Sequence, residues 1–421
     1  MNSGVHADIA VVGAGPAGLV AALALAADGA EVIVAGTPSG PAHATPSAHS
    51  DTRTAALILG SIQLLENLGV WPACMAESAA LLGIRIIDDS GELLRAPEVL
   101  FRASDVGLPS FGANVPLTAL TDALMAAVAR NARILWQGTA GVRSVRVRPD
   151  GAHLTLAEGD TLIARLVIGA DGANSVARQG AGIATRAWAY PQTAIAGSVV
   201  HTRTQGGMTT ELHRRSGPLT IVPLGENRAS FVWVEEPSEA ERLADLPDDL
   251  FLNELAARLQ GLLGELRTTG RRATFPLRGL RAERMAGARV ALVGEAAHVL
   301  PPIGAQGLNL SLRDAAFLAD CVLAARTAGE DIGAAKTLGD YEASRRGDVE
   351  SRTLFIDLLN RSLLGDLLPL AAARGVGLHL LANFPALRRL AIAGGLRGPG
   401  ATPRLMRGAT LRASKGMAPG P

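Results

Sequence analysis

The chain has few cysteines, few aromatic side chains and almost no net charge. Its two cysteines, Cys74 and Cys321, lie far apart without a CxxC pair, so we expect neither a disulfide framework nor a zinc site. Their number fits a reducing, cytoplasmic compartment. A net charge of +1 gives no reason to expect nucleic acid as a partner. With 421 residues, 48% of them hydrophobic, the chain is long enough for two or three globular lobes.

A membrane-spanning segment and a metal centre are both disfavoured. Residues 9–27 form an apolar run of 19 residues, but three glycines and a proline fall within six positions of it. The first eight residues lack the Lys or Arg of a signal peptide, so we expect the chain to keep its N-terminus. Glu295-x-x-His298 matches half of a di-iron motif, but no second Glu-x-x-His exists and Pro301-Pro302 interrupts any helix. We therefore expect no metal.

A glycine-rich turn near the N-terminus dominates what is present. An apolar run, residues 9–12, meets Gly13-Ala14-Gly15-Pro16-Ala17-Gly18, and a helical pattern follows. This is the strand–turn–helix of dinucleotide binding, in which the glycines permit the turn, the approach of a pyrophosphate and close helix packing. The helix N-terminus offers free N–H groups to phosphate. A plain strand–turn–helix is the alternative.

The second strand, residues 31–35, departs from this pattern. An acid at its end usually holds the adenosine ribose, but Ala35 and Gly36 stand there. After a loop at 38–50, residues 51–68 read as a helix that begins near Arg53. Arg53 is a candidate phosphate contact. An equally good interpretation is that its side chain lies on a helix face exposed to solvent.

Two further strand ends carry polar groups. The strand 162–168 runs into Gly169-Ala170-Asp171-Gly172, with Ser175 and Arg178 on the following helix start. A carboxylate at that place points into the ligand crevice of an open α/β sheet, although an Asp-Gly turn with a helix cap is the alternative. The strand 289–293 leads to Glu295, and the loop at 301–307 then opens a long helix. Its N–H groups form an anion site suited to a negatively charged ring.

The remaining segments outline a second lobe and a helical C-terminus. Residues 194–234 hold four alternating strands, which predict an antiparallel sheet inserted as a substrate wall. Residues 363–396 read as short leucine-rich helices, either a face that meets a membrane or a cap on the core. The tail from residue 398 is rich in Gly, Pro and basic residues and is predicted to be disordered.

Three motifs in this order, GAGPAG, GADG-xx-S-xx-R and GEAAH-xx-PP-x-GAQGLNL, resemble the FAD-dependent aromatic hydroxylases of the p-hydroxybenzoate hydroxylase fold. The similarity extends to about residue 360. The segment Asp51-x-Arg53-x-x-Ala56-Leu57, the stretch Trp188-x-Tyr190-x-Gln192 and the 301–309 loop most resemble the ubiquinone-biosynthesis hydroxylases within that family.

The resemblance implies an α/β fold in which a discontinuous Rossmann-like FAD-binding domain carries an inserted antiparallel β-sheet domain and C-terminal helices. The implied FAD-binding domain comprises 1–75, 101–185 and 273–350. The substrate-binding sheet domain comprises 76–100 and 186–272. The C-terminal helices span 351–397 and the disordered tail 398–421.

The resemblance also implies roles for individual residues. Implied FAD-binding residues are Gly13, Gly15, Ala17, Gly18, Arg53, Asp171, Glu295, Gly307, Leu308 and Asn309. Pro302, Gly304 and Gln306 are implied at the catalytic centre, beside flavin and substrate. Glu295 stands where the family commonly has aspartate on the ribityl hydroxyls. The N–H groups of 307–309 would face the flavin N1 and O2 and stabilise the anionic reduced flavin.

The implied reaction hydroxylates the aromatic ring of a polyprenylated ubiquinone precursor with molecular oxygen, through a flavin C4a-hydroperoxide. The reductant is NAD(P)H, for which no second GxGxxG exists, or a protein electron donor. Other ubiquinone-biosynthesis proteins and peripheral contact with the inner membrane are implied partners of a cytoplasmic enzyme. The alternatives are a hydroxylase of a soluble aromatic acid, a prenyl-reducing flavoprotein of related fold, and a non-catalytic assembly protein.

Overall fold

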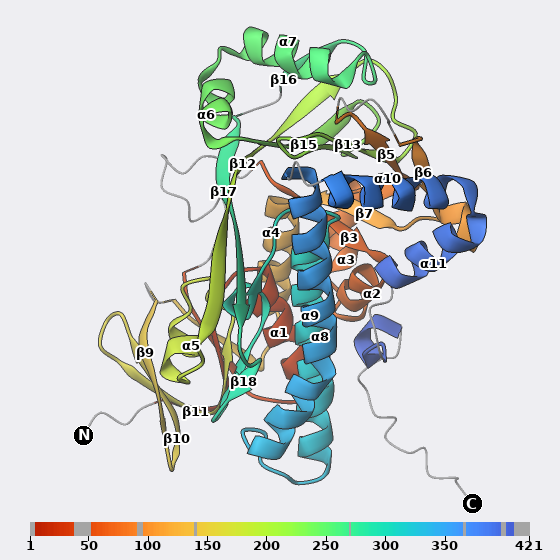
Figure 1. Cartoon of the computed structure of the whole chain (residues 1–421). Coiled ribbons are helices and arrows are strands. Elements are labelled where there is room, and N and C mark those ends of the chain that lie inside the picture. Colours follow the sequence, from red (N-terminus) through yellow and green to blue (C-terminus); the bar gives the residue numbers. More distant parts are fainter. Residues whose placement is uncertain are drawn as a thin grey trace, which may run out of the picture.

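The computed structural model describes residues 5–37, 52–90, 96–138, 141–268, 271–364, 368–396 and 401–407. Two large sheets lie one above the other in Figure 1, and a pair of long helices runs beside both. Predictions that fall on Asp51 and on the loop at 38–50 lie outside the described residues.

The N-terminal strand lies at the centre of the lower sheet. This sheet has eight strands: β1 (Val5–Val12), β2 (Val32–Ala35), β8 (Ile134–Gln137), β9 (Val142–Arg148), β10 (Gly151–Leu156), β11 (Thr161–Gly169), β18 (Ala286–Gly287) and β19 (Val290–Leu292). Its order is β18-β19-β11-β1-β2-β8, and β1 pairs in parallel with both β2 and β11. Strand β19 also pairs in parallel with β11. The three strands that carry the glycine turn, Asp171 and Glu295 therefore end at the same edge.

The upper sheet has nine strands: β5 (Gly83–Asp88), β6 (Val99–Arg102), β12 (Thr185–His201), β13 (Met208–His213), β14 (Pro218–Pro223), β15 (Arg228–Glu235), β16 (Leu266–Thr268), β17 (Ala273–Ala282) and β20 (His298–Val299). The predicted antiparallel pattern holds for most pairs, while β13 and β5 pair in parallel. The alternation predicted for 194–234 is observed, because one face packs on helices and the other borders a cavity.

A third sheet corrects one prediction. The helix predicted over 51–68 is wrong in its first half, because residues 54–58 form a strand. The sheet contains β3 (Thr54–Ile58), β4 (Ala79–Leu81) and β7 (Gly112–Pro116), with β3 antiparallel to β7. The helix α2 begins only at Leu59. Pairing with a strand that is distant in sequence has overridden the helical preference of Ala55, Ala56 and Leu57.

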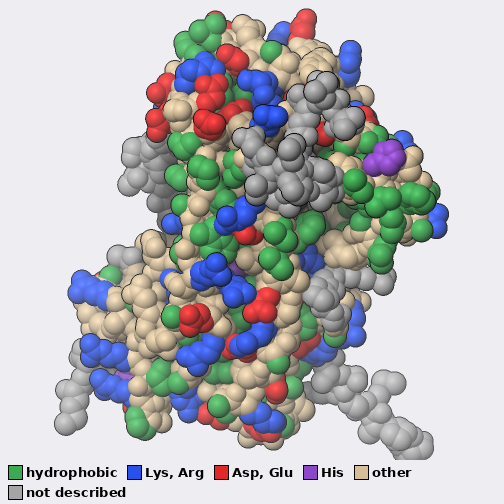
Figure 2. All heavy atoms as spheres, viewed as in Figure 1, with side chains coloured by type: hydrophobic (Ala, Val, Ile, Leu, Met, Phe, Trp, Pro, Cys, Tyr) green, Lys and Arg blue, Asp and Glu red, His purple; other side chains and the backbone are tan. Residues whose placement is uncertain are grey.

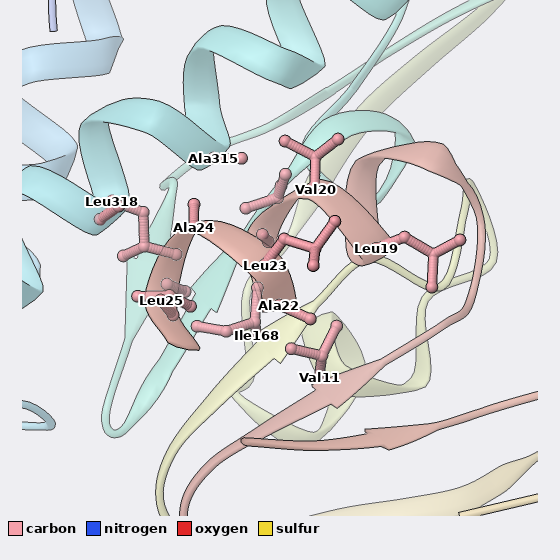
Figure 3. Packing of buried hydrophobic residues seen from close by; sticks show 14 of the residues in the cluster. Val11, Leu19, Val20, Ala22, Leu23, Ala24, Leu25, Ile168, Ala315 and Leu318 are labelled. Atoms are coloured by element: carbon pink, nitrogen blue, oxygen red, sulfur yellow. The ribbon is translucent and has the colours of Figure 1, made fainter. Parts of the chain in front are cut away.

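Helices cover both sheets. They are α1 (Pro16–Ala27), α2 (Leu59–Asn67), α3 (Trp71–Cys74), α4 (Leu117–Ala129), α5 (Val176–Gly180), α6 (Pro237–Asp245), α7 (Asp248–Leu259), α8 (Gln306–Thr327), α9 (Ala335–Leu364), α10 (Leu368–Asn383) and α11 (Pro385–Leu396), with 3-10 turns at Met75–Glu77, Ala103–Val106, Gly294–Ala296 and Arg404–Arg407. Figure 3 shows α1 between the strands and α8, with Val20 and Ala24 near Ala315 and Leu318. Helix α1 is buried almost all round, so it fixes α8 against the sheet.

Residues 188–192, which lie within β12, form hydrogen bonds with side chains of helix α9. The indole N–H of Trp188 donates to the Tyr190 hydroxyl, which donates to Asp357 at 2.7 Å. The amide of Asn360 donates to Gln192 Oε1 at 2.8 Å. Burial is the main effect that raises the pKa of Tyr190, to about 12, so its hydroxyl stays protonated as the donor. This joint holds α9 beside the upper sheet.

The C-terminus contains one correction. Disorder from residue 398 is wrong for residues 401–407, because Leu405 and Met406 are buried in the main core and Asn67 donates to the Leu405 carbonyl at 2.7 Å. The rest of the predicted tail lies outside the described residues. Among the helices of the described residues, none combines the length and hydropathy that a bilayer crossing requires.

Candidate active site

One cavity of about 1430 Å³ connects the two large sheets. It begins at the glycine turn after β1, passes the ends of β2, β11 and β19, and reaches the inner face of the upper sheet. Side chains from α9 and α11 close one side of it. A single volume therefore borders both the expected dinucleotide turn and the expected substrate wall.

The glycine turn is built for close backbone approach. At Gly13, where φ is +104°, a Cβ atom would lie 2.4 Å from the Ala170 carbonyl oxygen. A Cβ atom at Gly18 would lie 2.2 Å from the Gly13 carbonyl oxygen. At Gly15, by contrast, a Cβ atom would meet no protein atom within 4 Å, because this residue faces the cavity at the start of α1. That open space over a helix N-terminus fits a pyrophosphate.

The second strand end lacks the acid that usually binds ribose. A Cβ atom at Gly36 would lie 3.2 Å from the Ala14 nitrogen, so the backbone itself closes in on the turn. Thr37 follows and lines the cavity, although sequence analysis did not single it out. Its position two residues beyond β2 was the available signal, and its hydroxyl is the polar group nearest in sequence to the expected carboxylate.

Asp171 caps the helix that follows it. Its carboxylate accepts from the Ser175 hydroxyl at 2.5 Å and from the backbone N–H groups of Val176 and Ala177 at 2.6 and 3.1 Å. Arg178 is buried and donates to the carbonyls of Ala173 and Ala296 at 2.8 Å each. The helix-cap interpretation is therefore correct for these contacts, and Asp171 also lines the cavity. The capping fixes the GADG turn to the start of α5, and the bond from Arg178 to Ala296 joins α5 to the loop that contains Glu295.

The third strand end presents a carboxylate to the cavity. Gly294 has a φ of +65°, and a Cβ atom there would lie 3.0 Å from the Ser311 hydroxyl oxygen and 3.2 Å from Cβ of Ala17. The chain turns tightly at this point, and Glu295 is exposed and lines the cavity beside His298. An exposed carboxylate in this position can accept hydrogen bonds from the hydroxyls of a ribityl chain.

The loop before α8 has a left-handed backbone at two successive residues. Gly304 has a φ of +62° and Ala305 a φ of +55°, which is uncommon for a residue with a side chain. Pro302, Gly304 and Gly307 are exposed and line the cavity. Because the helix begins at Gln306, its first N–H groups point into this part of the cavity and can stabilise negative charge there.

Asn309 holds this helix start in place with its side chain. Its Oδ1 accepts from the Ile58 backbone N–H at 3.0 Å and from the Ser61 hydroxyl at 2.7 Å. Its Nδ2 donates to the carbonyls of Ala56 and Ala305 at 2.8 and 2.6 Å. The buried amide therefore ties α8 to β3 and α2. The sequence offered no signal for these contacts, because all but one of them reach residues about 250 positions earlier.

A buried charge network lies behind the loop. His298 Nε2 and Asp314 Oδ2 are 2.6 Å apart, and the same oxygen accepts from the Gly294 N–H at 3.1 Å. Arg345 Nε donates to Asp314 at 2.7 Å, and its NH1 donates to Asp348 at 2.9 Å. Burial by itself raises the pKa of Asp314, but His298 and Arg345 outweigh it and hold that pKa below its usual value.

The network continues to the loop through a second arginine. Arg352 donates to Asp348 at 2.7 Å and also to Gln306 Oε1, while Gln306 Nε2 donates to the Gly304 carbonyl at 2.9 Å. Gln306 thus links α9 to the left-handed loop. The sequence patterns did not point to Asp314 and Arg345. The available signal was an Arg-Asp pair at positions 313 and 314, directly before the apolar residues 315–319 of the same helix.

Arg53 lies at the entrance to β3. Its guanidinium stands 5.4 Å from the centre of the Phe275 ring, and the side chain lines the cavity. The next residue, Thr54, donates to Ser230 on the upper sheet at 2.9 Å. Asn114 donates to Ser230 at 3.2 Å and to the Pro223 carbonyl at 3.0 Å. These polar contacts join the small third sheet to the substrate wall.

Most of the sequence-predicted site residues meet around this cavity. Those that line it are Gly13, Gly15, Ala17, Arg53, Asp171, Glu295, Pro302, Gly304, Gln306, Gly307 and Leu308. Gly18 lies behind the turn, where it permits the contact between helix and strand, and Asn309 lies behind the loop. Within the described residues, no group of acidic, histidine or cysteine side chains could hold a metal ion.

Comparisons with known proteins agree with this geometry. The FAD binding domain family matches residues 6–353. The ubiquinone hydroxylase UbiL of Rhodospirillum rubrum is 36% identical over 408 residues, which cover 96% of this chain and 94% of that protein. The 3-demethoxyubiquinol 3-hydroxylase of Escherichia coli is 32% identical over 385 residues, 91% of this chain and 97% of that protein.

Solved structures resemble the fold as a whole. The p-nitrophenol 4-monooxygenase PnpA of Pseudomonas putida superposes with a TM-score of 0.73 at 20% identity, over 94% of this chain and 100% of that one. PqsL of Pseudomonas aeruginosa, described as a probable FAD-dependent monooxygenase, gives 0.72 at 23% identity over 89% and 99%. The predicted fold, that of the p-hydroxybenzoate hydroxylase family, is confirmed.

Proposed function

Because the chain belongs to the FAD binding domain family and is an FAD-dependent aromatic-ring monooxygenase, we propose that it hydroxylates the ring of a polyprenylated ubiquinone precursor. The cofactor would supply the reactive oxygen as a flavin C4a-hydroperoxide. Relatives named as ubiquinone hydroxylases, matched along nearly their whole length, support the pathway.

The observation that carries the proposal is the lining of the cavity near the upper sheet. Apolar side chains dominate there, and among the described lining residues the only arginine or lysine is Arg53, whose guanidinium stands over the Phe275 ring. Phe355, Ile356 and Leu359 from α9, with Ile392 and Leu396 from α11, form an apolar wall. Such a wall suits a prenyl tail, because burying each methylene group contributes about 0.8 kcal/mol.

The same lining argues against the alternative in which the substrate is a soluble aromatic acid. A substrate carboxylate needs a positive partner in a site of low polarity. Apart from His298, which pairs with Asp314, the ionisable residue that the upper sheet contributes to the described lining is Glu211, which repels a carboxylate. A phenol with an apolar tail meets neither difficulty.

We propose the following roles for the residues around FAD. Gly13, Gly15 and Gly18, with Ala17, would accommodate the pyrophosphate at the start of α1, and Arg53 would contact phosphate. Glu295 would accept from the ribityl hydroxyls, and Asp171 would hold the GADG turn by capping α5. The N–H groups of Gly307, Leu308 and Asn309 would face the pyrimidine edge of the flavin and stabilise its negative charge.

The loop residues Pro302, Gly304 and Gln306 would act by position rather than by acid–base chemistry. Pro302 and Gly304 would border the reacting ring and keep water away from it, which protects the oxygenated cofactor. Gln306 would keep the loop in its left-handed form through its bonds to Gly304 and Arg352. The reductant would be NAD(P)H or a protein donor, and molecular oxygen the second substrate.

The proposed location is cytoplasmic, peripheral on the inner membrane and with other ubiquinone-biosynthesis proteins as partners. Eight exposed hydrophobic side chains on α9, α10 and α11 and at the junction between the last two support it. They are here named the apolar helical face: Leu354, Phe355, Leu358, Val376, Leu380, Phe384, Leu387 and Leu390. Figure 2 shows hydrophobic side chains gathered over α10 and α11. Phe355 belongs both to this face and to the cavity lining, so a tail could pass from one to the other.

The test is mass spectrometry of the quinone pool after deletion of the gene in its own host. The expected result is loss of ubiquinone and accumulation of an under-hydroxylated prenylphenol, whose structure identifies the ring carbon. Complementation with the wild-type gene should restore the pool. An unchanged pool in a host without a second hydroxylase for the same position would contradict the proposal and favour a soluble aromatic substrate.

A further inference from the structure

One charged side chain of the cavity lies apart from the others. Among the described lining residues, five carry groups that titrate or are charged: Arg53, Asp171, Glu211, Glu295 and His298. Four of them follow the strand ends and loops assigned to the cofactor. His298 lies on β20, at the edge of the upper sheet, where it pairs with Asp314. Glu211 lies on β13, inside that sheet, and no catalytic or cofactor-binding role proposed above involves its carboxylate.

Glu211 stands in a row of side chains that crosses the cavity face of this sheet. Its neighbours in register are Ile86 on β5 and Thr220 on β14, and Val232 on β15 lies opposite Thr220. All four side chains line the cavity. Strands β5, β14 and β15 contribute no titratable side chain to the described lining. The row is therefore apolar or hydroxylic apart from a single buried carboxylate.

The protein itself provides Glu211 with little hydrogen bonding. In the described part of the chain its one hydrogen-bond partner is His213 Nε2, at 3.4 Å, and Nδ1 of that buried histidine has no partner. A buried carboxylate is costly unless strong donors satisfy it. A purely structural pairing with His213 would account for the contact between the two side chains. It does not explain why that contact is long, or why Glu211 faces the cavity. A ligand hydroxyl in the cavity could supply the missing donor.

We infer that Glu211 binds the phenol hydroxyl of the substrate ring and acts as its general base. The inference rests on the proposed function, since it assigns the group that recognises and activates the phenol. An aromatic ring is attacked more readily by an electrophilic oxygen when its hydroxyl is deprotonated. Glu211 is suited to this task because its carboxylate is the proton acceptor on the wall that faces the cofactor half of the cavity.

As oxygen is transferred to the ring, the phenol O–H bond breaks, an O–H bond forms on Glu211, and the oxygen lone pair moves into the ring to form a carbonyl. The ring would receive its new oxygen from the oxygenated cofactor, whose O–O bond breaks, and the cofactor would keep the second oxygen atom with the electron pair of that bond. The new C–O bond makes one ring carbon tetrahedral. That carbon then loses its proton to solvent, and the electron pair of the C–H bond restores aromaticity. Glu211 returns its proton to the carbonyl oxygen, which becomes a hydroxyl again.

The experiment is a single turnover that needs no natural reductant. FAD-loaded enzyme is reduced with one equivalent of dithionite without oxygen and then mixed with oxygenated buffer that contains 2-farnesylphenol. Hydroxylated product and hydrogen peroxide are measured per flavin. We expect Glu211→Gln to lower the rate of product formation about 100-fold, as for a lost general base, and to raise peroxide correspondingly. Glu211→Asp should retain part of the rate.

The pH profile separates a catalytic role from a structural one. Product formation by the wild type should fall at acid pH, and Glu211→Gln should lack this acid limb. The other groups that face the cavity, Arg53, Asp171, Glu295, His298 and the strand neighbour His213, are unchanged in the variant. A rate in Glu211→Gln equal to that of the wild type, with the same profile, would overturn the inference.

Binding gives an independent readout if the variant turns over too slowly. The wild type should bind 2-farnesylphenol more tightly than its methyl ether, measured by perturbation of the flavin spectrum, and Glu211→Gln should lose this preference. Glu241→Gln, which removes an exposed carboxylate from α6, is the control. If the wild type hydroxylates no phenol, the proposed function fails. If it does and Glu211→Gln matches it, only the inference fails.

Discussion

At Gly13 and Gly18 the folded backbone has no room for a side chain, whereas at Gly15 it has. The contacts that a Cβ atom would make at the first two residues are with other backbone atoms of the turn, at 2.4 and 2.2 Å. Gly15 has φ and ψ of −76° and 172°, which any residue can adopt. Gly13 and Gly18 are therefore required by the fold, whereas the missing side chain at Gly15 leaves space for a ligand.

We predict that Gly15→Ala weakens FAD binding, whereas Gly13→Ala lowers the stability of the protein. Gly15→Ala should leave the unfolding midpoint of the FAD-free protein unchanged and raise the Kd for FAD at least tenfold, because the methyl group enters the proposed phosphate space. Gly13→Ala should destabilise the FAD-free protein itself by about 2 kcal/mol or more, through strain and overlap. Thermal unfolding with and without FAD, and fluorescence titration of the flavin, measure both. Unaltered FAD affinity in Gly15→Ala would refute the assignment.

Residues whose role depends on backbone geometry were the easiest to predict from sequence. The glycine turn has a fixed spacing and lies between a strand and a helix, and the structure places it there. The roles of Asn309 and Asp314 could not be predicted, because their partners are buried groups on other elements. Glu211 reads in sequence as an ordinary polar residue of an alternating strand, and only the cavity distinguishes it from a solvent-facing one.

At the scale of elements, a few charges connect α8, α9 and the loop at 294–298. Asp314 on α8 bonds to His298 and Gly294 in front and to Arg345 on α9 behind. Both Asp314 and Arg345 are fully buried. Removing one partner leaves an uncompensated buried charge, which is far more costly than the loss of an exposed ion pair.

We predict that Asp314→Asn lowers the free energy of unfolding by about 3–5 kcal/mol at pH 7. Because the pKa of Asp314 is lower in the folded state, its contribution is complete above the unfolded value of about 4 and is lost as the pH falls through the folded value. The difference between wild type and variant should therefore shrink below about pH 4. Urea unfolding across this pH range measures it.

Exposed Asp105→Asn is the control for this network and should change stability little at any pH. A second check is the double variant of Asp314→Asn with Arg345→Met, which should recover part of the loss, since it removes the stranded cation as well. A difference between wild type and Asp314→Asn that grows on acidification would contradict the assignment.

For one element the local sequence predicted the wrong type of secondary structure. The segment Ala55-Ala56-Leu57 favours a helix, yet its pairing with β7 makes it a strand and so moves Arg53 from a helix start to a strand entrance. Regular elements with local patterns, such as β11 and α8, were predicted correctly because their patterns are local. The limits predicted for the domains stay predictions.

At the scale of the whole molecule, exposed hydrophobic side chains are concentrated at one end. Eight of the fourteen large hydrophobic side chains that are exposed in the described residues belong to the apolar helical face. The sequence from 368 to 396 contains three arginines, one histidine and no acidic residue. Helix α10 packs on α9 and α11, and Ile392 of α11 is buried beside Phe111. The C-terminal helices thus cap the core with one side and expose the other, which combines both interpretations of their sequence.

An exposed apolar surface flanked by positive charge suits the headgroup region of an anionic bilayer. We predict that the protein floats with vesicles that contain phosphatidylglycerol, less with neutral ones, and that added salt weakens the difference. The double variant Phe384→Gln, Leu390→Gln should bind at least tenfold more weakly, while its turnover of 2-farnesylphenol in detergent stays the same, since neither residue lines the cavity. Leu135→Gln removes an exposed leucine from β8, at the edge of the lower sheet, and should bind like the wild type. Equal flotation of the double variant and the wild type would show that the apolar helical face serves another partner.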